Sequence, residues 1–143
     1  MQPTFGLSRE QTNELFYKTY KNVSGKFHFH SQLELFFVDE GEVDVFINDK
    51  NRRLKAGEMS VTLSYDAHTY RSAGDSVSSL LIIPVDYCEI FLEKIKNKKP
   101  ADPFLCHGPT VKDLRECYSR IVESADNRLK TVGYIYVMFG IIS

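Results

Sequence analysis

The stretch GKFHFHSQLELFFVDEGE, residues 25–42, sets two histidines and a glutamate in a run of alternating apolar residues. Alternate residues of a strand face opposite sides, so His28 and His30 share one face and their imidazoles can converge on one point. Glu34 falls on the next strand, beyond a tight bend, and can approach that point from the side. This stretch therefore predicts a strand pair that carries a candidate site.

Short β-strands continue on both sides of this pair. Runs of Val, Ile, Phe and Tyr alternate with the turn signals DEGE, NDKN, KAGE and SAGDS, a spacing typical of antiparallel barrels or sandwiches. The predicted strands are Lys26–His30, Leu33–Asp39, Glu42–Ile47, Arg52–Lys55, Ser60–Leu63, His68–Arg71 and Val77–Ile83. No helix is expected between Phe16 and Pro84.

The hydrophobic period changes after Pro84. A first amphipathic helix is predicted near residues 86–96, and a second follows from about residue 110. The last segment is apolar on nearly every side from Val132 onward and ends without a cap or a polar tail. Such a helix must be buried or paired, so we expect the chain to be part of a longer protein. The alternative is a natural C-terminus that packs into the core.

Length and composition favour a single cytoplasmic domain. The chain has 143 residues, 43% of them hydrophobic, which is enough for one core. The formal net charge is −1, whereas a nucleic-acid-binding domain usually carries an excess of basic residues. No leader pattern or apolar run of membrane-spanning length is visible, so we expect no membrane contact. Three cysteines without CxxC spacing suit reduced thiols.

A fourth candidate ligand is His68, on a strand that a closing barrel would bring opposite the first three. With His28, His30 and Glu34 it could bind a divalent metal through imidazole nitrogens and a carboxylate. The same groups could instead bind a polar small molecule, or be hydrogen-bonded structural residues. Tyr65 and Tyr70 flank His68 and are predicted to line a ligand pocket.

These residues resemble the cupin family. Gly25, His28, His30, Glu34 and Gly41 match the spacing of its first motif, and Gly57 with His68 resembles the second. Leu63 stands where the family usually has proline, and no asparagine follows His68 at the expected distance. The resemblance implies a double-stranded β-helix, or jelly-roll, barrel followed by two to three C-terminal helices.

Among cupins, residues 15 to 143 are most similar to the N-terminal domain of AraC-type transcription regulators. The resemblance implies an N-terminal arm (1–15), a cupin barrel that binds an effector (16–108), and a helical dimerisation segment (109–143), followed by a missing DNA-binding domain with two helix-turn-helix motifs. The effector would be a sugar or small polar compound. The residues implied at the homodimer interface are Leu114, Tyr118, Ile121, Leu129, Val132, Tyr136 and Phe139, although packing against the chain's own barrel is the alternative for them.

The sequence thus favours a sensing domain without catalytic residues and without a required cofactor. The alternative is a metal-dependent cupin enzyme, such as a dioxygenase or isomerase, that uses His28, His30, Glu34 and His68. No further acid or base stands out within the motifs, which weighs against that alternative.

Overall fold

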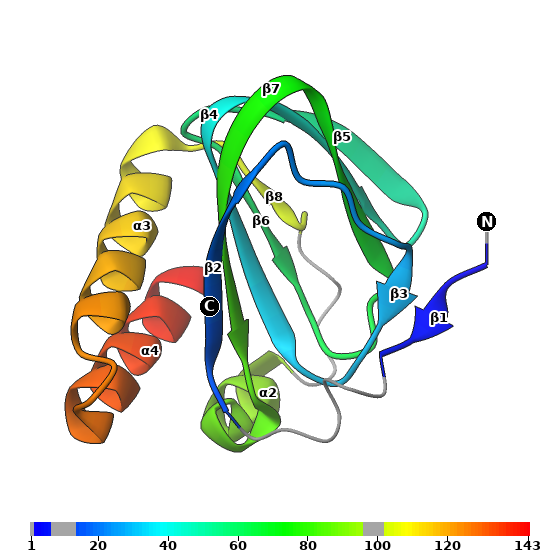
Figure 1. Ribbon diagram of the computed structural model, residues 1–143. Coiled ribbons are helices and arrows are strands. Elements are labelled where there is room, and N and C mark those ends of the chain that lie inside the picture. Colours follow the sequence, from blue (N-terminus) through cyan, green and yellow to red (C-terminus); the bar gives the residue numbers. More distant parts are fainter. Residues whose placement is uncertain (1, 7–13, 96–101) are drawn as a thin grey trace.

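The fold is a β-barrel with a layer of helices on one side (Figure 1). The computed structural model describes residues 2–6, 14–95 and 102–143. Its strands are β1 (Thr4–Phe5), β2 (Phe16–Lys21), β3 (His28–Phe29), β4 (Leu33–Ile47), β5 (Lys50–Lys55), β6 (Met59–Thr62), β7 (His68–Ile83) and β8 (Phe104–Leu105). The helices are a 3₁₀ turn η1 (Val85–Tyr87), α2 (Glu89–Ile95), α3 (Gly108–Glu123) and α4 (Arg128–Ile142).

Two long strands, β4 and β7, belong to both faces of the barrel. They are paired antiparallel from Leu33–Ile83 to Ile47–His68, with register shifts between Val38 and Glu42. The first half of β4 also pairs with β6, and the second half pairs with β5. On its other side, β7 pairs with β2 through its second half and with β3 through its first residue, His68. The barrel is thus one sheet folded across two bent strands.

The predicted turns DEGE and SAGDS are wrong. The structure has a continuous β4 where two strands were predicted, and a continuous β7 likewise. Glycines in these segments bend the strands instead of ending them, because Gly41 and Gly74 adopt φ of 75° and 77° and the ladder shifts register beside Gly41. Each other expected strand region contains a strand, although Lys26–His30 is reduced to β3 (His28–Phe29), and no helix occurs in residues 16–84, which are described throughout.

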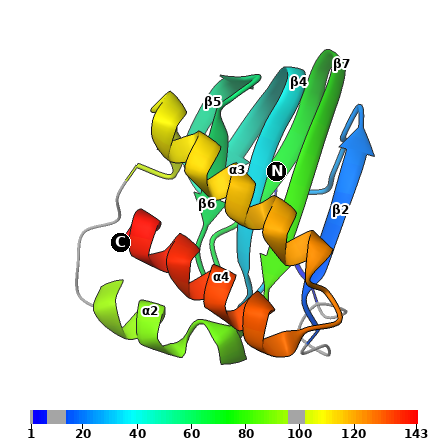
Figure 2. The ribbon, with the colours of Figure 1, turned by 90° about the vertical axis from the view of Figure 1, so that its left-hand side faces the viewer.

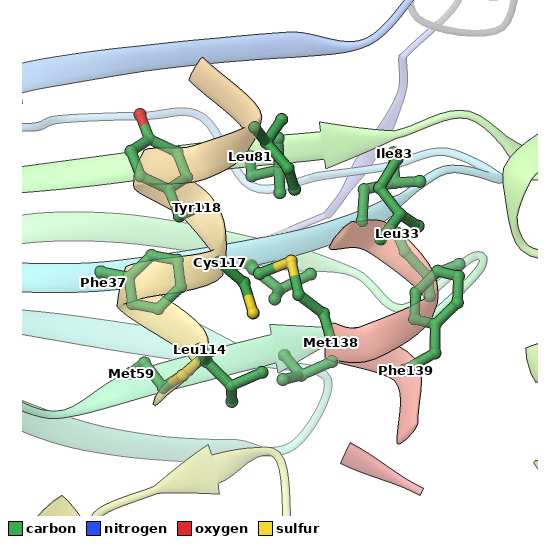
Figure 3. Close-up of a cluster of buried hydrophobic side chains, with 14 of the residues drawn as sticks. Leu33, Phe37, Met59, Leu81, Ile83, Leu114, Cys117, Tyr118, Met138 and Phe139 are labelled. Atoms are coloured by element: carbon green, nitrogen blue, oxygen red, sulfur yellow. The ribbon is translucent and has the colours of Figure 1, made fainter. Parts of the chain in front are cut away.

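The helices cover the outer face of one side of the barrel (Figure 2). Odd-numbered residues of the first half of β4 point to them, so Leu33, Leu35 and Phe37 pack in one cluster with residues of α3 and α4 (Figure 3). Even-numbered residues of the same half point inward, where Phe36 and Val38 join a second cluster inside the barrel. The strand period of two therefore separates a helix-facing core from a barrel interior.

The helix segments follow the prediction closely. The first is divided into η1 and α2, and the later two are α3 and α4. The predicted arm includes residues 7–13 and the predicted first helix ends at residue 96, and these positions lie outside the described residues. Of the helices in the described ranges, none has the length and hydropathy needed to cross a membrane.

We expect Gly41→Ala to lower the free energy of unfolding by about 3 kcal/mol, because a Cβ there would lie 2.1 Å from the Asp75 carbonyl oxygen and φ is positive. Gly74→Ala is the matched control. It has the same positive φ but open space around the added Cβ, so it should cost only about 1 kcal/mol. Urea denaturation measures both, and equal losses would show that the close approach of β4 and β7 does not require Gly41.

Candidate metal centre

Three histidines and one glutamate meet at one end of the barrel interior. His28 lies on β3, His30 immediately after it, Glu34 on β4, and His68 opens β7 directly opposite His28. One ligand atom from each residue lies within 4.8 Å of the others. The predicted convergence of His28, His30, Glu34 and His68 is present in the fold.

Backbone carbonyls set the tautomers of two imidazoles. His28 Nδ1 lies 2.7 Å from the Lys26 carbonyl oxygen, and His68 Nδ1 lies 2.8 Å from that of Asp66. A carbonyl oxygen can only accept, so both Nδ1 atoms carry the proton and donate. Each neutral ring therefore directs an unprotonated Nε2 to the cluster, which is the form that binds metal.

Glu34 links the cluster. Its Oε1 accepts a hydrogen bond from His30 Nε2 at 2.7 Å, and its Oε2 lies 3.0 Å from His68 Nε2. Burial alone would raise the pKa of this carboxyl, but hydrogen bonds with His30 and His68 outweigh burial and hold the pKa well below its usual range. Glu34 is therefore a buried carboxylate anion that depends on its neighbours.

The charge of Glu34 also acts on the imidazoles. Burial would lower the pKa of His68, but hydrogen bonding to Glu34 and its charge raise it overall. For His28 burial prevails and the pKa is lowered. The carboxylate thus favours positive charge at His68, and a cation bound among the nitrogens would be stabilised by the same carboxylate.

Only one member of the cluster is substantially open to solvent. The side chain of His28 is 29% exposed, whereas those of His30, Glu34 and His68 are buried. A ligand that enters from solvent would meet His28 first. The cluster is therefore open to solvent on the side of β3, which carries His28.

The two predicted tyrosines behave differently. Tyr70 is buried, and its hydroxyl donates to Glu34 Oε2 at 2.6 Å. Tyr65 is 59% exposed and meets the site region through its backbone N–H, which donates to the His30 carbonyl at 2.7 Å. Tyr70 is thus part of the cluster and the Tyr65 side chain is largely in solvent.

Sequence reasoning missed the two carbonyls that orient His28 and His68. Backbone groups of Lys26 and Asp66 leave no side-chain signature, although both precede their histidine by two residues. It also missed that Phe36 stacks on Tyr70, with ring centroids 4.0 Å apart and planes at 9°. For Tyr70 the sequence predicted only a place in the lining of a ligand pocket.

The donor set fits a divalent transition metal. Three imidazole nitrogens and one carboxylate oxygen suit zinc, iron, nickel or cobalt. Ligands at about 2.1 Å from one ion lie at most about 4.2 Å apart, so the four atoms need only a small inward movement to share one. The orientation of His28 and His68 by backbone carbonyls and the buried carboxylate of Glu34 make this cluster a candidate metal centre.

A groove of about 560 Å³ lies elsewhere, on the helix side of the barrel. It runs between α3 and β4, and its lining includes Asp39, Lys112 and Arg115. Arg115 Nε donates to Asp39 Oδ1 at 3.0 Å, so these two charges are paired with each other. None of the four cluster residues lines this groove.

The barrel is recognised by comparison with known families. Residues 19–84 match the model of the cupin domain, and the match includes all four cluster residues. Taken with the two-faced topology of β4 and β7, this shows that the fold is a cupin barrel followed by C-terminal helices, as predicted. Comparison with curated proteins found no match.

Solved structures with the same fold include an RmlC-like cupin from Shewanella frigidimarina, with 21% identity, a TM-score of 0.46, and coverage of 50% of this chain and 68% of that one. A cupin-2 domain containing protein from the same organism has 26% identity and a TM-score of 0.43, over 50% and 72% of the two chains. ToxT from Vibrio cholerae has 11% identity and a TM-score of 0.51. That match covers 71% of this chain and 46% of ToxT.

We expect Glu34→Ala to lower the free energy of unfolding of the metal-free protein by about 3 kcal/mol, because His30 and Tyr70 would lose a buried charged partner. Asp44→Ala on the same strand is the control, since Asp44 pairs with Arg53 in solvent and its loss should cost less than about 1 kcal/mol. Urea denaturation with a chelator present compares them. A loss no larger than that of the control would contradict the role given to Glu34.

Proposed function

We propose that this chain is the effector-sensing and dimerisation domain of a cytoplasmic, bacterial AraC-type transcription regulator, with a DNA-binding region outside this chain. The observation that supports it most is the pair α3 and α4 packed on a cupin barrel. ToxT, an AraC-family regulator, shares the fold over 71% of this chain. Residues 19–84 make up less than half of the chain, so this likeness extends beyond the residues matched to the cupin domain.

In this proposal the effector binds inside the barrel, beside Glu34 and Tyr70. The interior also holds buried hydroxyls of Ser60 and Ser78, which have no hydrogen-bond partner among the described residues. Buried hydroxyls are normally satisfied by protein, water or ligand. A small polar compound such as a sugar supplies the missing partners, and an apolar one does not.

The outer surface of α4 supports dimerisation. Of the predicted interface residues, Leu114, Tyr118, Ile121 and Phe139 are buried against the chain's own barrel. Val132 is partly exposed, while Leu129 is 88% exposed and Tyr136 is 48% exposed. Val137, which was not among the predicted residues, is a further apolar side chain and is 52% exposed. A second copy would therefore contact α4 through Leu129, Tyr136 and Val137, because Leu114, Tyr118, Ile121 and Phe139 already belong to the core.

We expect the purified chain to form a homodimer and Leu129→Glu to shift it to monomer, since a charge at this exposed position costs the fold little and opposes an apolar interface. Phe5→Glu is the control, at an exposed apolar residue on β1. Sedimentation velocity over a range of concentrations gives the masses. A monomeric parent chain, or a dimer that survives the α4 substitution, would remove the dimerisation part of the proposal.

The reading frame of the full-length gene tests the regulator itself. Two helix-turn-helix patterns within about a hundred residues downstream are expected of this class of regulator. A stop codon directly after Ser143 would refute it.

The second candidate is a metal-dependent cupin enzyme, and the convergence of four donor atoms within 4.8 Å favours it. We propose in either case that His28, His30, Glu34 and His68 hold one divalent metal. When bound, such an ion supplies a Lewis acid that polarises an oxygen of the ligand. His28, the partly exposed member, would line the side from which that ligand enters.

We expect protein purified without chelators to carry about one equivalent of a divalent transition metal, and His30→Ala to lose it. His107→Ala is the matched control, because this fourth histidine pairs with Thr110 Oγ1 at 2.8 Å and stands outside the cluster. Elemental analysis of the three proteins decides. Metal-free parent protein that also fails to take up Zn²⁺ would exclude the metal centre and, with it, the enzyme.

A further inference from the structure

Glu34 uses both carboxylate oxygens, each on a different side of the cluster. Oε1 faces His30 at 2.7 Å and His28 at 3.9 Å. Oε2 faces His68 at 3.0 Å and receives the Tyr70 hydroxyl at 2.6 Å. Rotation of the carboxylate would break the short hydrogen bond from Tyr70, so the orientation of Glu34 depends on a residue outside the donor set.

Tyr70 is itself held in place by the barrel. Its ring is stacked face to face on Phe36, and the side chain is only 5% exposed. Tyr70 is paired with Val45 across β7 and β4, while Phe36 lies one inward-facing position beyond Glu34 on β4. The hydroxyl therefore reaches Glu34 from a ring with little freedom to move.

The hydroxyl can serve only as a donor to this carboxylate. An ionised carboxylate has no proton to donate, so the phenol is the donor of this hydrogen bond. A neutral donor next to a carboxylate forms a charge-assisted hydrogen bond. Groups of this kind, which hydrogen-bond a metal ligand without touching the metal, commonly change metal affinity by about 10- to 100-fold.

We propose that Tyr70 is a positioning residue of the metal centre, which holds the Glu34 carboxylate in the orientation that presents Oε1 to His28 and His30. This inference rests on the proposed metal site. It assigns to Tyr70 a role in ion binding, in addition to its place beside the proposed effector. It also explains why a tyrosine is buried at this depth with its hydroxyl directed at an anion.

The test is Zn²⁺ affinity, measured by competition with a chromophoric chelator for the parent chain, Tyr70→Phe and Tyr17→Phe. Tyr70→Phe keeps the ring that stacks on Phe36 and removes only the hydroxyl, so the dissociation constant should rise about 10- to 100-fold. Tyr17 lies on β2 and is 36% exposed. Tyr17→Phe is the matched control and should leave the dissociation constant unchanged. A value for Tyr70→Phe within twofold of the parent would overturn the proposal.

A double substitution separates positioning from a general effect on the barrel. In a Glu34→Gln background the three histidines still bind Zn²⁺, and adding Tyr70→Phe should then change the dissociation constant by less than twofold. The same factor in both backgrounds would show that Tyr70 does not act through the Glu34 carboxylate, and would overturn the proposal.

The outcomes also separate this inference from the metal site on which it rests. A parent chain that does not bind Zn²⁺ would overturn both. A parent chain that binds Zn²⁺ as tightly as Tyr70→Phe would overturn the positioning role alone.

Discussion

The buried carboxylate of Glu34 is the constraint around which the barrel interior is arranged. An ionised carboxylate without partners is costly to bury, and Glu34 is only 1% exposed. Its partners come from two other segments: His30 follows β3, while His68 and Tyr70 open β7. Glu34 and its three partners do not all lie on one face of the barrel. The anion is therefore stabilised only when the barrel closes.

The bent strands make this closure possible. In its first half β4 carries Glu34 beside β6, and in its second half it pairs with the start of β7 that carries His68 and Tyr70. Straight strands would leave these two halves in one plane. The bend near Gly41, where β4 approaches Asp75 closely, instead folds the sheet over and brings His68 to Glu34.

Much of the site could be predicted from the sequence because its signal is local. The spacing of His28 and His30 follows the strand period, and Glu34 comes soon after. The strand ends could not be predicted in the same way. DEGE and SAGDS have the composition of turns, yet pairing across fourteen positions of β4 and β7 outweighs that local preference. The hydroxyl of Tyr70 and the carbonyls of Lys26 and Asp66 depend on tertiary geometry, which has no sequence period.

The helix layer shows why burial and partner contact are hard to separate by pattern alone. α4 is apolar on most sides, and the resemblance implied seven residues of α3 and α4 at a dimer interface. The barrel buries four of them, including Leu114 and Phe139, and leaves Leu129 and Tyr136 outside. Side chains as exposed as those of Leu129 and Tyr136 do not contribute to the core of this chain. Contact with a partner would bury them. The sensing proposal assigns that exposed apolar surface to contact with a second copy and the cluster to the inside of the barrel.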